Sequence, residues 1–313
     1  MRKTFLAVSA AICLATAVSA AEFINVLTGG TSGIYYPLGV ALSQMYAKAI
    51  PDSKTAVQAT KASVENLNLL QAGRGEAAIS FGDSLSDAYK GNTEAGFKAP
   101  LSKLRTISAL YPNYIHFVAA ADSGIKSFDD IKGKRISVGA PKSGTELNSR
   151  AILAAAGISY KDFAKVEYLS YAESVELMKN RQLDVTLLSS GAGVAALRDL
   201  ATSQKVVFLT IPEEIVKKID DPAYQVGVIP ANTYEGQTSD VKTVSVQNFL
   251  VTHSGVSEQT VYTMTKTMFE NLDQMVAAHA AAKGIKLENA AKNPPAPLHP
   301  GAERYYKEVG VLK

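Results

Sequence analysis

Cysteine is nearly absent from the sequence, and the one cysteine, Cys13, lies within the first twenty residues. Without that segment the chain has no thiol for a disulfide bond, a thiolate metal site or a cysteine nucleophile. Tryptophan is absent, and no two of the four histidines have the helical spacing of metal ligands. The Gly-x-Ser-x-Gly motif of a nucleophile elbow is also missing. The sequence therefore predicts no metal, no cofactor and no enzymatic activity.

The sequence also lacks a large excess of either positive or negative residues. The chain has 32 lysine and arginine residues against 29 aspartate and glutamate residues, a net charge of +3, and no basic tract. Nucleic-acid binding requires a concentrated basic surface. We therefore expect no nucleic-acid partner.

The first twenty residues are expected to be a signal peptide. Arg2 and Lys3 precede an uncharged apolar run over 5–18, and the small residues Val18-Ser19-Ala20 suit a cleavage site. A membrane anchor is the alternative, but the run is short for a bilayer span. Cleavage removes 20 of 313 residues, leaves 293, and lowers the net charge from +3 to +1, because two basic residues are lost. The sequence thus predicts an exported, periplasmic protein with room for two domains.

Short β-rich runs alternate with helical patterns along the rest of the chain, which favours βαβ units and parallel sheets. This rhythm restarts after Tyr111-Pro112-Asn113. We expect two α/β lobes joined by hinge strands around a ligand cleft, with lobe 1 at 21–113 and 250–313 and lobe 2 at 114–249. Strands are expected at 23–28, 55–60, 77–81, 115–120, 135–138, 166–169, 184–188, 206–209 and 243–251. Helices are expected at 35–49, from Ser63 to Gly73, at 146–156, at 259–282 and near Tyr305.

The loop Gly29-Gly30-Thr31-Ser32-Gly33 lies between an expected strand and helix. Its glycines allow the backbone to approach a ligand closely, and the following helix directs free N–H groups toward that ligand. Tyr35 is expected to form a wall of the pocket or of the core. The alternative for the loop is a tight turn in which Ser32 caps the helix.

Ser143-Gly144-Thr145-Glu146 repeats this arrangement in the second block. Ser143 and Glu146 fit a capping box, which explains the segment without a ligand. Two such loops at strand ends, one in each block, nevertheless predict a shared cleft, because open α/β sheets bind ligands there.

Other polar residues sit at expected helix starts, strand ends or hinge positions, and each has an alternative structural role. We expect Lys61 either to pair with an anionic group of the ligand or to lie on the surface. We expect Asp83 either to accept a hydrogen bond from a ligand ammonium or to cap a helix. The remaining candidates for the cleft are Ser63, Asn66, Ser189, Ser190, Gln247 and Asn248.

Several of these segments together resemble the TAXI family, the extracytoplasmic receptors of tripartite ATP-independent periplasmic (TRAP) transporters. The likeness is carried, in order, by Gly29–Gly33 with Tyr35-Tyr36-Pro37-Leu38-Gly39, Ala62–Leu67, Ile131–Arg135, Gly139, Ser143–Glu146, Val246-Gln247-Asn248 and Pro297–Tyr306. It implies a type II periplasmic binding-protein fold, binding without chemistry, and delivery of the ligand to a TRAP permease. Ligands of similar receptors include glutamate, glutamine and 2-oxoglutarate.

The sequence departs from this family at three places. Phe81-Gly82 stands where relatives often have Gln-Ser, Lys61 replaces a small residue, and Ser189-Ser190 replaces a more aromatic or glycine-rich strand end. These departures bear on ligand identity. We expect a monomeric receptor for a small carboxylate, such as an acidic amino acid or a dicarboxylate. The alternatives are a periplasmic sensor subunit and a secreted hydrolase on the same frame.

Overall fold

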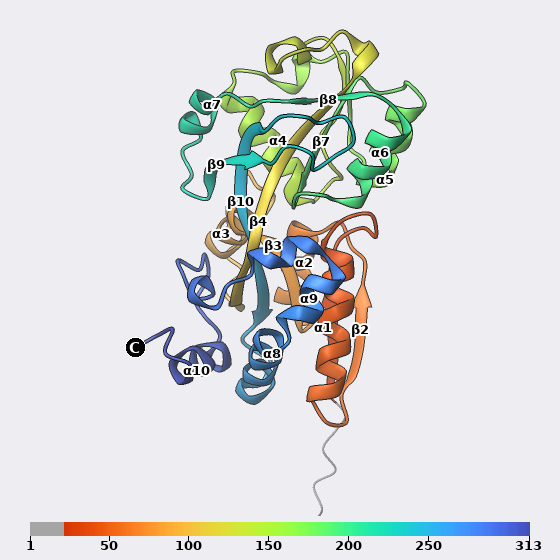
Figure 1. Cartoon of the computed structure of the whole chain (residues 1–313). Helices are drawn as coiled ribbons and strands as arrows, with labels where there is room; N and C mark the ends of the chain where they lie inside the picture. Colours follow the sequence, from red (N-terminus) through yellow and green to blue (C-terminus); the bar gives the residue numbers. More distant parts are fainter. Residues whose placement is uncertain (1–21) are drawn as a thin grey trace, which may run out of the picture.

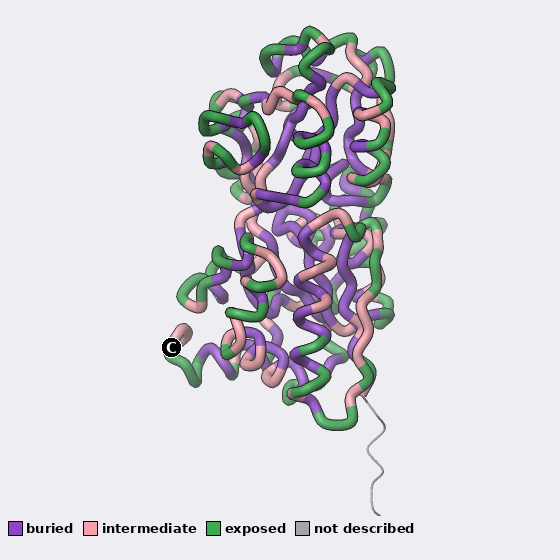
Figure 2. The backbone as a smooth tube through the Cα atoms, turned by 45° about the vertical axis from the view of Figure 1, so that its right-hand side comes forward, coloured by how far each residue is buried: buried purple, intermediate pink, exposed green. Residues whose placement is uncertain are grey.

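A computed structural model of the chain describes residues 22–313, and the expected signal peptide lies outside these residues. Two lobes are stacked end to end, and two long strands, β4 (Leu104–Ala120) and β10 (Val241–His253), run through both of them (Figure 1). Buried backbone continues through the junction between the lobes (Figure 2). The mixed α/β architecture with two lobes confirms the expected fold class.

The first lobe contains a parallel half-sheet in the order β2-β1-β3, which is completed by one half of β10 and of β4. Each parallel strand is followed by a helix, as the alternating pattern predicts. The elements are β1 (Phe23–Leu27), α1 (Tyr35–Ala49), β2 (Lys54–Gln58), α2 (Ser63–Gln71), β3 (Ala77–Phe81) and α3 (Gly82–Lys90).

The second lobe repeats this plan. Strands β7, β5 and β6 are parallel to one another, while β4 pairs antiparallel with both β7 and β8, and β9 pairs antiparallel with β10. The elements are η1 (Ala121–Ser123), η2 (Phe128–Ile131), β5 (Arg135–Ser137), α4 (Gly144–Ala155), η3 (Tyr160–Asp162), β6 (Lys165–Glu167), α5 (Tyr171–Lys179), β7 (Val185–Ser190), α6 (Ala195–Ser203), β8 (Val206–Leu209), α7 (Glu213–Lys218) and β9 (Tyr224–Ile229).

The two crossing strands pair with each other on both sides of the junction. Phe249 lies opposite Ala109 in the first lobe, and Gln247 lies opposite Pro112 toward the second lobe. The register shifts between these pairs, so that β4 contains one residue more than β10. Such a bulge bends a strand pair, and it places the bend where the lobes meet. The predicted lobe boundaries, 113/114 and 249/250, fall within these strands and stay a prediction.

The C-terminal segment returns to the first lobe. Helices α8 and α9 pack against α1, and Thr106 of β4 forms a bridge with Leu298. The segment therefore completes the core of the lobe that begins the chain. Its elements are α8 (Glu258–Glu270), α9 (Leu272–Ala278), η4 (Ala280–Gly284), η5 (Leu287–Asn289) and α10 (Pro300–Glu308).

Three sequence expectations differ from the structure. The strand expected at 115–120 is the second half of the 17-residue β4, whose first half was not expected. Strand β9 was not expected, because its pattern of buried and exposed residues is irregular and contains a glycine. The helix expected at 259–282 is divided at Asn271 into α8 and α9 and ends in η4. Within the described part of the chain, no helix combines the length and hydrophobicity needed to cross a bilayer.

Gly39 allows α1 to pack closely on β1, and we expect Gly39→Ala to lower the free energy of unfolding. A Cβ atom there would lie 2.3 Å from Cγ2 of Thr28, whose hydroxyl is fixed by a 2.9 Å hydrogen bond to the Gln58 carbonyl. Overpacking of this kind costs about 1–3 kcal/mol, and the better helix propensity of alanine offsets up to about 1 kcal/mol. Urea denaturation measures the difference, with Gln44→Ala on the exposed face of α1 as the control. An equally stable Gly39→Ala protein would contradict the close packing.

Candidate functional site: a cavity between the lobes

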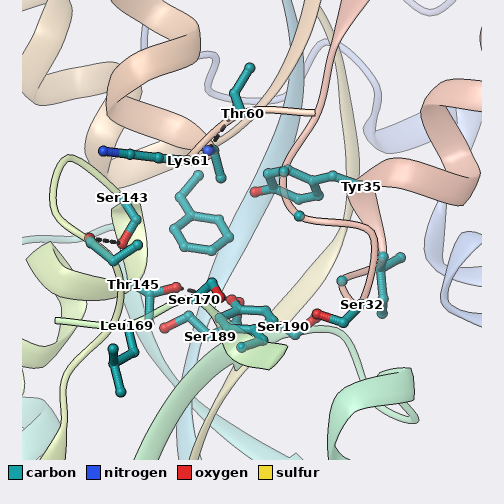
Figure 3. A pocket seen from close by; sticks show the side chains of 18 residues that line it. Ser32, Tyr35, Thr60, Lys61, Ser143, Thr145, Leu169, Ser170, Ser189 and Ser190 are labelled. Carbon is teal, nitrogen blue, oxygen red and sulfur yellow. Dashed lines mark hydrogen bonds between the residues drawn. The ribbon is translucent and has the colours of Figure 1, made fainter. Parts of the chain in front are cut away.

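A cavity of about 110 Å³ lies between the lobes, at the ends of strands from both half-sheets (Figure 3). Its walls come from the loops after β1, β2, β5 and β6 and from the last residues of β3 and β7. Parallel strands end at the same edge of a sheet, so the helices that follow them begin near one another. The lining residues are Gly29, Gly30, Ser32, Gly33, Ile34, Tyr35, Thr60, Lys61, Ala62, Phe81, Ala140, Ser143, Thr145, Leu169, Ser170, Tyr171, Ser189 and Ser190.

Four helices begin at this cavity. The first residues of α1 and α5, Tyr35 and Tyr171, line it, as do Ala62, which precedes α2, and Ser143, which precedes α4. The first N–H groups of a helix have no partner within the helix and carry partial positive charge. The starts of α1 and α2 also lack a side-chain cap, so their first N–H groups are available to another acceptor; in α1 these belong to Tyr35 and Tyr36, because Pro37 has no N–H. The arrangement suits an anion.

Two residues beside these helix starts have unusual backbone angles. Ala62 has a φ of 71° and Lys142, which directly precedes Ser143, has a φ of 62°. Residues with a Cβ atom adopt this left-handed conformation at a cost of about 1–3 kcal/mol, and such strain concentrates at functional sites. The strain therefore supports the identification of the cavity as the functional site.

Most hydroxyl groups around the cavity already donate their hydrogen to the protein. Ser143 donates to the Ala140 carbonyl at 2.7 Å. Tyr171 donates to the carbonyl of Ser189, so the 2.9 Å contact between Tyr171 and Thr145 uses the hydrogen of Thr145. Ser189 differs, because its Oγ is buried and has no hydrogen-bond partner among the described residues.

Eight of the predicted site residues line the cavity, namely Gly30, Ser32, Tyr35, Lys61, Ser143, Thr145, Ser189 and Ser190. They come from both lobes, so the structure brings together the two loops that the sequence suggested as partners. Among residues 22–313, Lys61 is the one lysine or arginine in the lining. Its side chain is exposed and extends away from Tyr35 (Figure 3). The roles of these residues as ligand contacts stay predictions.

Three predicted residues of the first lobe lie outside the lining. Thr31 is exposed at the surface. Ser63 accepts a hydrogen bond from the Phe81 N–H at 3.1 Å, and Asn66 donates to the carbonyls of Thr28 and Ile79 at 2.8 and 3.0 Å. Ser63 and Asn66 therefore fix the strand ends that form the wall, rather than facing the space themselves.

Gly144 lies outside the lining because it is pressed against the opposite lobe. A Cβ atom on Gly144 would lie 2.4 Å from Cδ2 of Phe81 and 2.8 Å from Oγ of Ser63. The lobes also meet through a hydrogen bond from the Ala196 N–H to the Ser32 carbonyl at 3.3 Å. The structure is therefore a closed arrangement of the two lobes.

Asp83 was a candidate partner for a ligand ammonium, but the structure places it in a hydrogen-bond network between the lobes. Its Oδ2 accepts from Asn148 Nδ2 at 2.6 Å and from the Tyr224 hydroxyl at 2.7 Å. Asn148 and Tyr224 belong to the second lobe, and Asp83 is 2% exposed. Burial raises the pKa of Asp83 to about 6, against the opposing effect of the Tyr224 hydrogen bond; the charges of Asp221 and Asp87 raise it further.

Glu146 is also occupied by neighbouring residues. Its carboxylate accepts from Arg150 Nε at 3.1 Å and from the Tyr160 hydroxyl at 3.0 Å. The expected capping box is half formed: Ser143 accepts from the Glu146 N–H at 3.2 Å, but the Glu146 side chain pairs with Arg150 instead of returning to Ser143. Thus neither Asp83 nor Glu146 lines the cavity.

The two amides of the hinge strand β10 face different surroundings. Asn248 accepts from the Tyr35 hydroxyl at 2.6 Å and donates to the Tyr111 carbonyl at 2.9 Å. It therefore orients the ring that forms one wall of the cavity. Gln247 lines a separate groove of about 710 Å³, together with residues such as Asp221 and Lys292.

Sequence reasoning missed several lining residues, above all Tyr171 and the aromatic wall at Phe81. Tyr171 follows Ser170, which forms a complete capping box with Glu173. This Ser-x-x-Glu pattern after an expected strand is a recognisable sign of a helix start. No comparable pattern marks Phe81, Thr60 or Leu169, whose positions follow from the packing of the two lobes.

The acidic and histidine side chains of the described residues are dispersed or packed in the core. No group of three or more histidine, cysteine, aspartate or glutamate side chains is positioned to hold a metal ion among residues 22–313. His116 is buried, with Nε2 2.9 Å from the Tyr234 hydroxyl, and burial lowers its pKa to about 4. These properties are those of a histidine packed in the core.

Comparison with known proteins relates most of the chain to one family and one fold. The sequence matches the NMT1-like family over residues 26–310. Similar solved structures include a periplasmic transporter (12% identity, 92% of this chain and 93% of that chain, TM-score 0.57). Another is the alkanesulfonate-binding protein SsuA from Xanthomonas axonopodis pv. citri bound to MOPS (16% identity, 92% and 85%, TM-score 0.50). A third was described for glutathione import via GshT and the cystine ABC importer TcyBC of Streptococcus mutans (11% identity, 85% and 98%, TM-score 0.52).

The Asp83 network makes stability depend on pH, and Asp83→Asn isolates this effect. The pKa of Asp83 is 3.8 in the unfolded reference and about 6 in the folded protein, so the folded state binds more protons between these values. The contribution of Asp83 to the free energy of unfolding is therefore greatest at low pH. It decreases as pH rises from about 4 to about 6, and the total decrease is on the order of 3 kcal/mol.

Urea denaturation of both proteins from pH 4 to pH 7.5 provides the measurement. The wild-type protein should lose stability relative to Asp83→Asn as pH rises through this window. Parallel curves for the two proteins would show that Asp83 ionises as freely in the folded state as in the unfolded one.

Proposed function

This chain belongs to the NMT1-like family, and we propose that it is an exported solute-binding receptor that captures a small carboxylate. The observation that carries the proposal is the meeting of four helix starts, two of them without side-chain caps, at a cavity between the lobes. Of the described residues, those that line the cavity include no aspartate or glutamate. A carboxylate bound there would thus lie next to helix N–H groups and next to no acidic side chain.

Hydrogen bonds from the helix starts can supply the binding free energy that such a receptor needs. A hydrogen bond to a charged group contributes roughly 1.5–3 kcal/mol net. Four or five such bonds, less the cost of ordering ligand and lobes, correspond to a binding free energy near 8 kcal/mol, or about micromolar affinity. The fold also occurs in an alkanesulfonate-binding protein, whose ligand class is likewise anionic.

The proposed partner is the membrane permease of a TRAP transporter. The support for this is the set of TAXI-like segments, which occur in order along the chain from Gly29 to Tyr306. The signal-peptide pattern supports a periplasmic location, and a monomeric receptor is suited by a cavity whose walls all come from one chain. Glutamate and 2-oxoglutarate are the first ligands suggested by the resemblance.

Isothermal titration calorimetry tests the ligand class. We expect one carboxylate among glutamate, 2-oxoglutarate, succinate and shorter acids to bind in a 1:1 ratio with a Kd on the order of micromolar. The corresponding neutral amide should bind at least about tenfold more weakly, because it lacks the charge that the helix starts stabilise. Mass spectrometry should recover the ligand unchanged. Equal affinity for the acid and its amide would contradict an anion site, and product formation would indicate an enzyme.

Gly144→Val tests whether closure of the lobes is required for binding. The larger side chain would meet Phe81 and Ser63 across the junction, so it should hold the lobes apart and weaken binding by about tenfold or more. Small-angle scattering with saturating ligand should show compaction of the wild type and less compaction of the variant. Ala154→Val, on the exposed face of α4, is the control. Wild-type affinity in Gly144→Val would contradict the closed form as the binding form.

A further inference from the structure

The size of the closed cavity restricts the ligand. A protein cavity of about 150 Å³ takes up benzene, which has six non-hydrogen atoms, so a cavity of about 110 Å³ suits a ligand of about that size or smaller. Glutamate and 2-oxoglutarate are clearly larger. The cavity in the closed protein therefore fits a shorter acid than those suggested by the family resemblance.

The charges around the cavity restrict the ligand further. An amino acid carries an ammonium group, which needs an acidic partner when it is buried. The two nearby candidates are used elsewhere, Asp83 by Asn148 and Tyr224 and Glu146 by Arg150 and Tyr160. A second carboxylate would need a second cation, yet the lining of the described structure offers Lys61 alone, with its side chain extended toward solvent. A ligand with one negative charge and no positive charge therefore matches this lining.

Ser189 adds a directional polar contact. The residue ends β7, lines the cavity and is 1% exposed. Its Oγ has no hydrogen-bond partner among residues 22–313, whereas Ser143, Thr145 and Tyr171 use their hydrogens within the protein. A buried hydroxyl without a partner costs about 1–3 kcal/mol, and a ligand oxygen placed beside it would remove this cost.

We propose that the cavity takes a compact 2-oxo or 2-hydroxy monocarboxylate, whose carboxylate lies at the helix starts and whose second oxygen is hydrogen-bonded by Ser189 Oγ. The short alkyl end of the ligand then packs against Phe81 and Leu169, which provide apolar surface in the same lining. This inference rests on the proposed carboxylate receptor and narrows its ligand. Ser189 is the residue that distinguishes these acids from plain fatty acids.

Calorimetry with a defined set of acids tests the proposal on the wild-type protein. Pyruvate and lactate should bind about tenfold more tightly than propionate, which lacks the oxygen at the second carbon, because one hydrogen bond is lost. Alanine should bind more weakly than lactate, because its ammonium group has no acidic partner in the lining. Glutamate and 2-oxoglutarate should bind more weakly than pyruvate, because they exceed the closed cavity.

Ser189→Ala provides the matched protein variant. It should lower the affinity for pyruvate and lactate to that for propionate, while leaving propionate binding unchanged. Ser203→Ala, at an exposed serine of α6, should leave all affinities unchanged, and thermal melting without ligand verifies that each variant is folded. An equal loss for all three acids would show that Ser189 acts through packing alone and would overturn its proposed role.

The outcomes also separate this proposal from the receptor function on which it rests. Tight binding of glutamate or 2-oxoglutarate, without binding of pyruvate or lactate, would overturn the compact ligand and retain the carboxylate receptor. Binding of none of these acids would count against both. Equal affinity for pyruvate and propionate would overturn the contact to the second oxygen.

Discussion

Strands β4 and β10 pair antiparallel through the first lobe and across the junction as far as Tyr114 and Ser245, and both strands continue into the second lobe, which holds the two half-sheets in one frame. Each half-sheet ends its parallel strands toward the same junction. The helices that follow then begin there, so the positive ends of α1, α2, α4 and α5 face one cavity. The register shift between Gln247 and Phe249 lies at this junction, where a bend alters the distance between the lobes without disturbing either core.

The closed junction is stabilised by contacts that would be lost on opening. Asp83 gains two hydrogen bonds from the second lobe, but burial raises its pKa to about 6, so its charged form is costly near neutral pH. Gly144 permits direct contact with Phe81. The closed form is therefore favoured by packing but weakened by the buried Asp83 carboxylate, whose charge is only partly compensated by its hydrogen bonds. An anion bound at the helix starts would stabilise the closed form further.

Local patterns in the sequence predicted much of this structure. The glycine loop before Tyr35 and the alternation of strands and helices identified the helix starts, because turn and capping residues act over a few positions. The contacts of Asp83 were not predictable from local patterns. Asp83 has partners 65 and 141 residues away, and no local pattern reports such contacts. Glu146 is different, since its pairing with Arg150 four residues later follows ordinary helical spacing and was open to prediction.

The central claim is that main-chain N–H groups at the helix starts, rather than a cationic side chain, hold a ligand carboxylate. A crystal structure of the protein with its bound acid tests this most directly. The account predicts carboxylate oxygens within about 3 Å of N–H groups at the starts of α1, α2 or α4, with the Lys61 ammonium directed toward solvent. A carboxylate paired with Lys61 and remote from every helix start would contradict it.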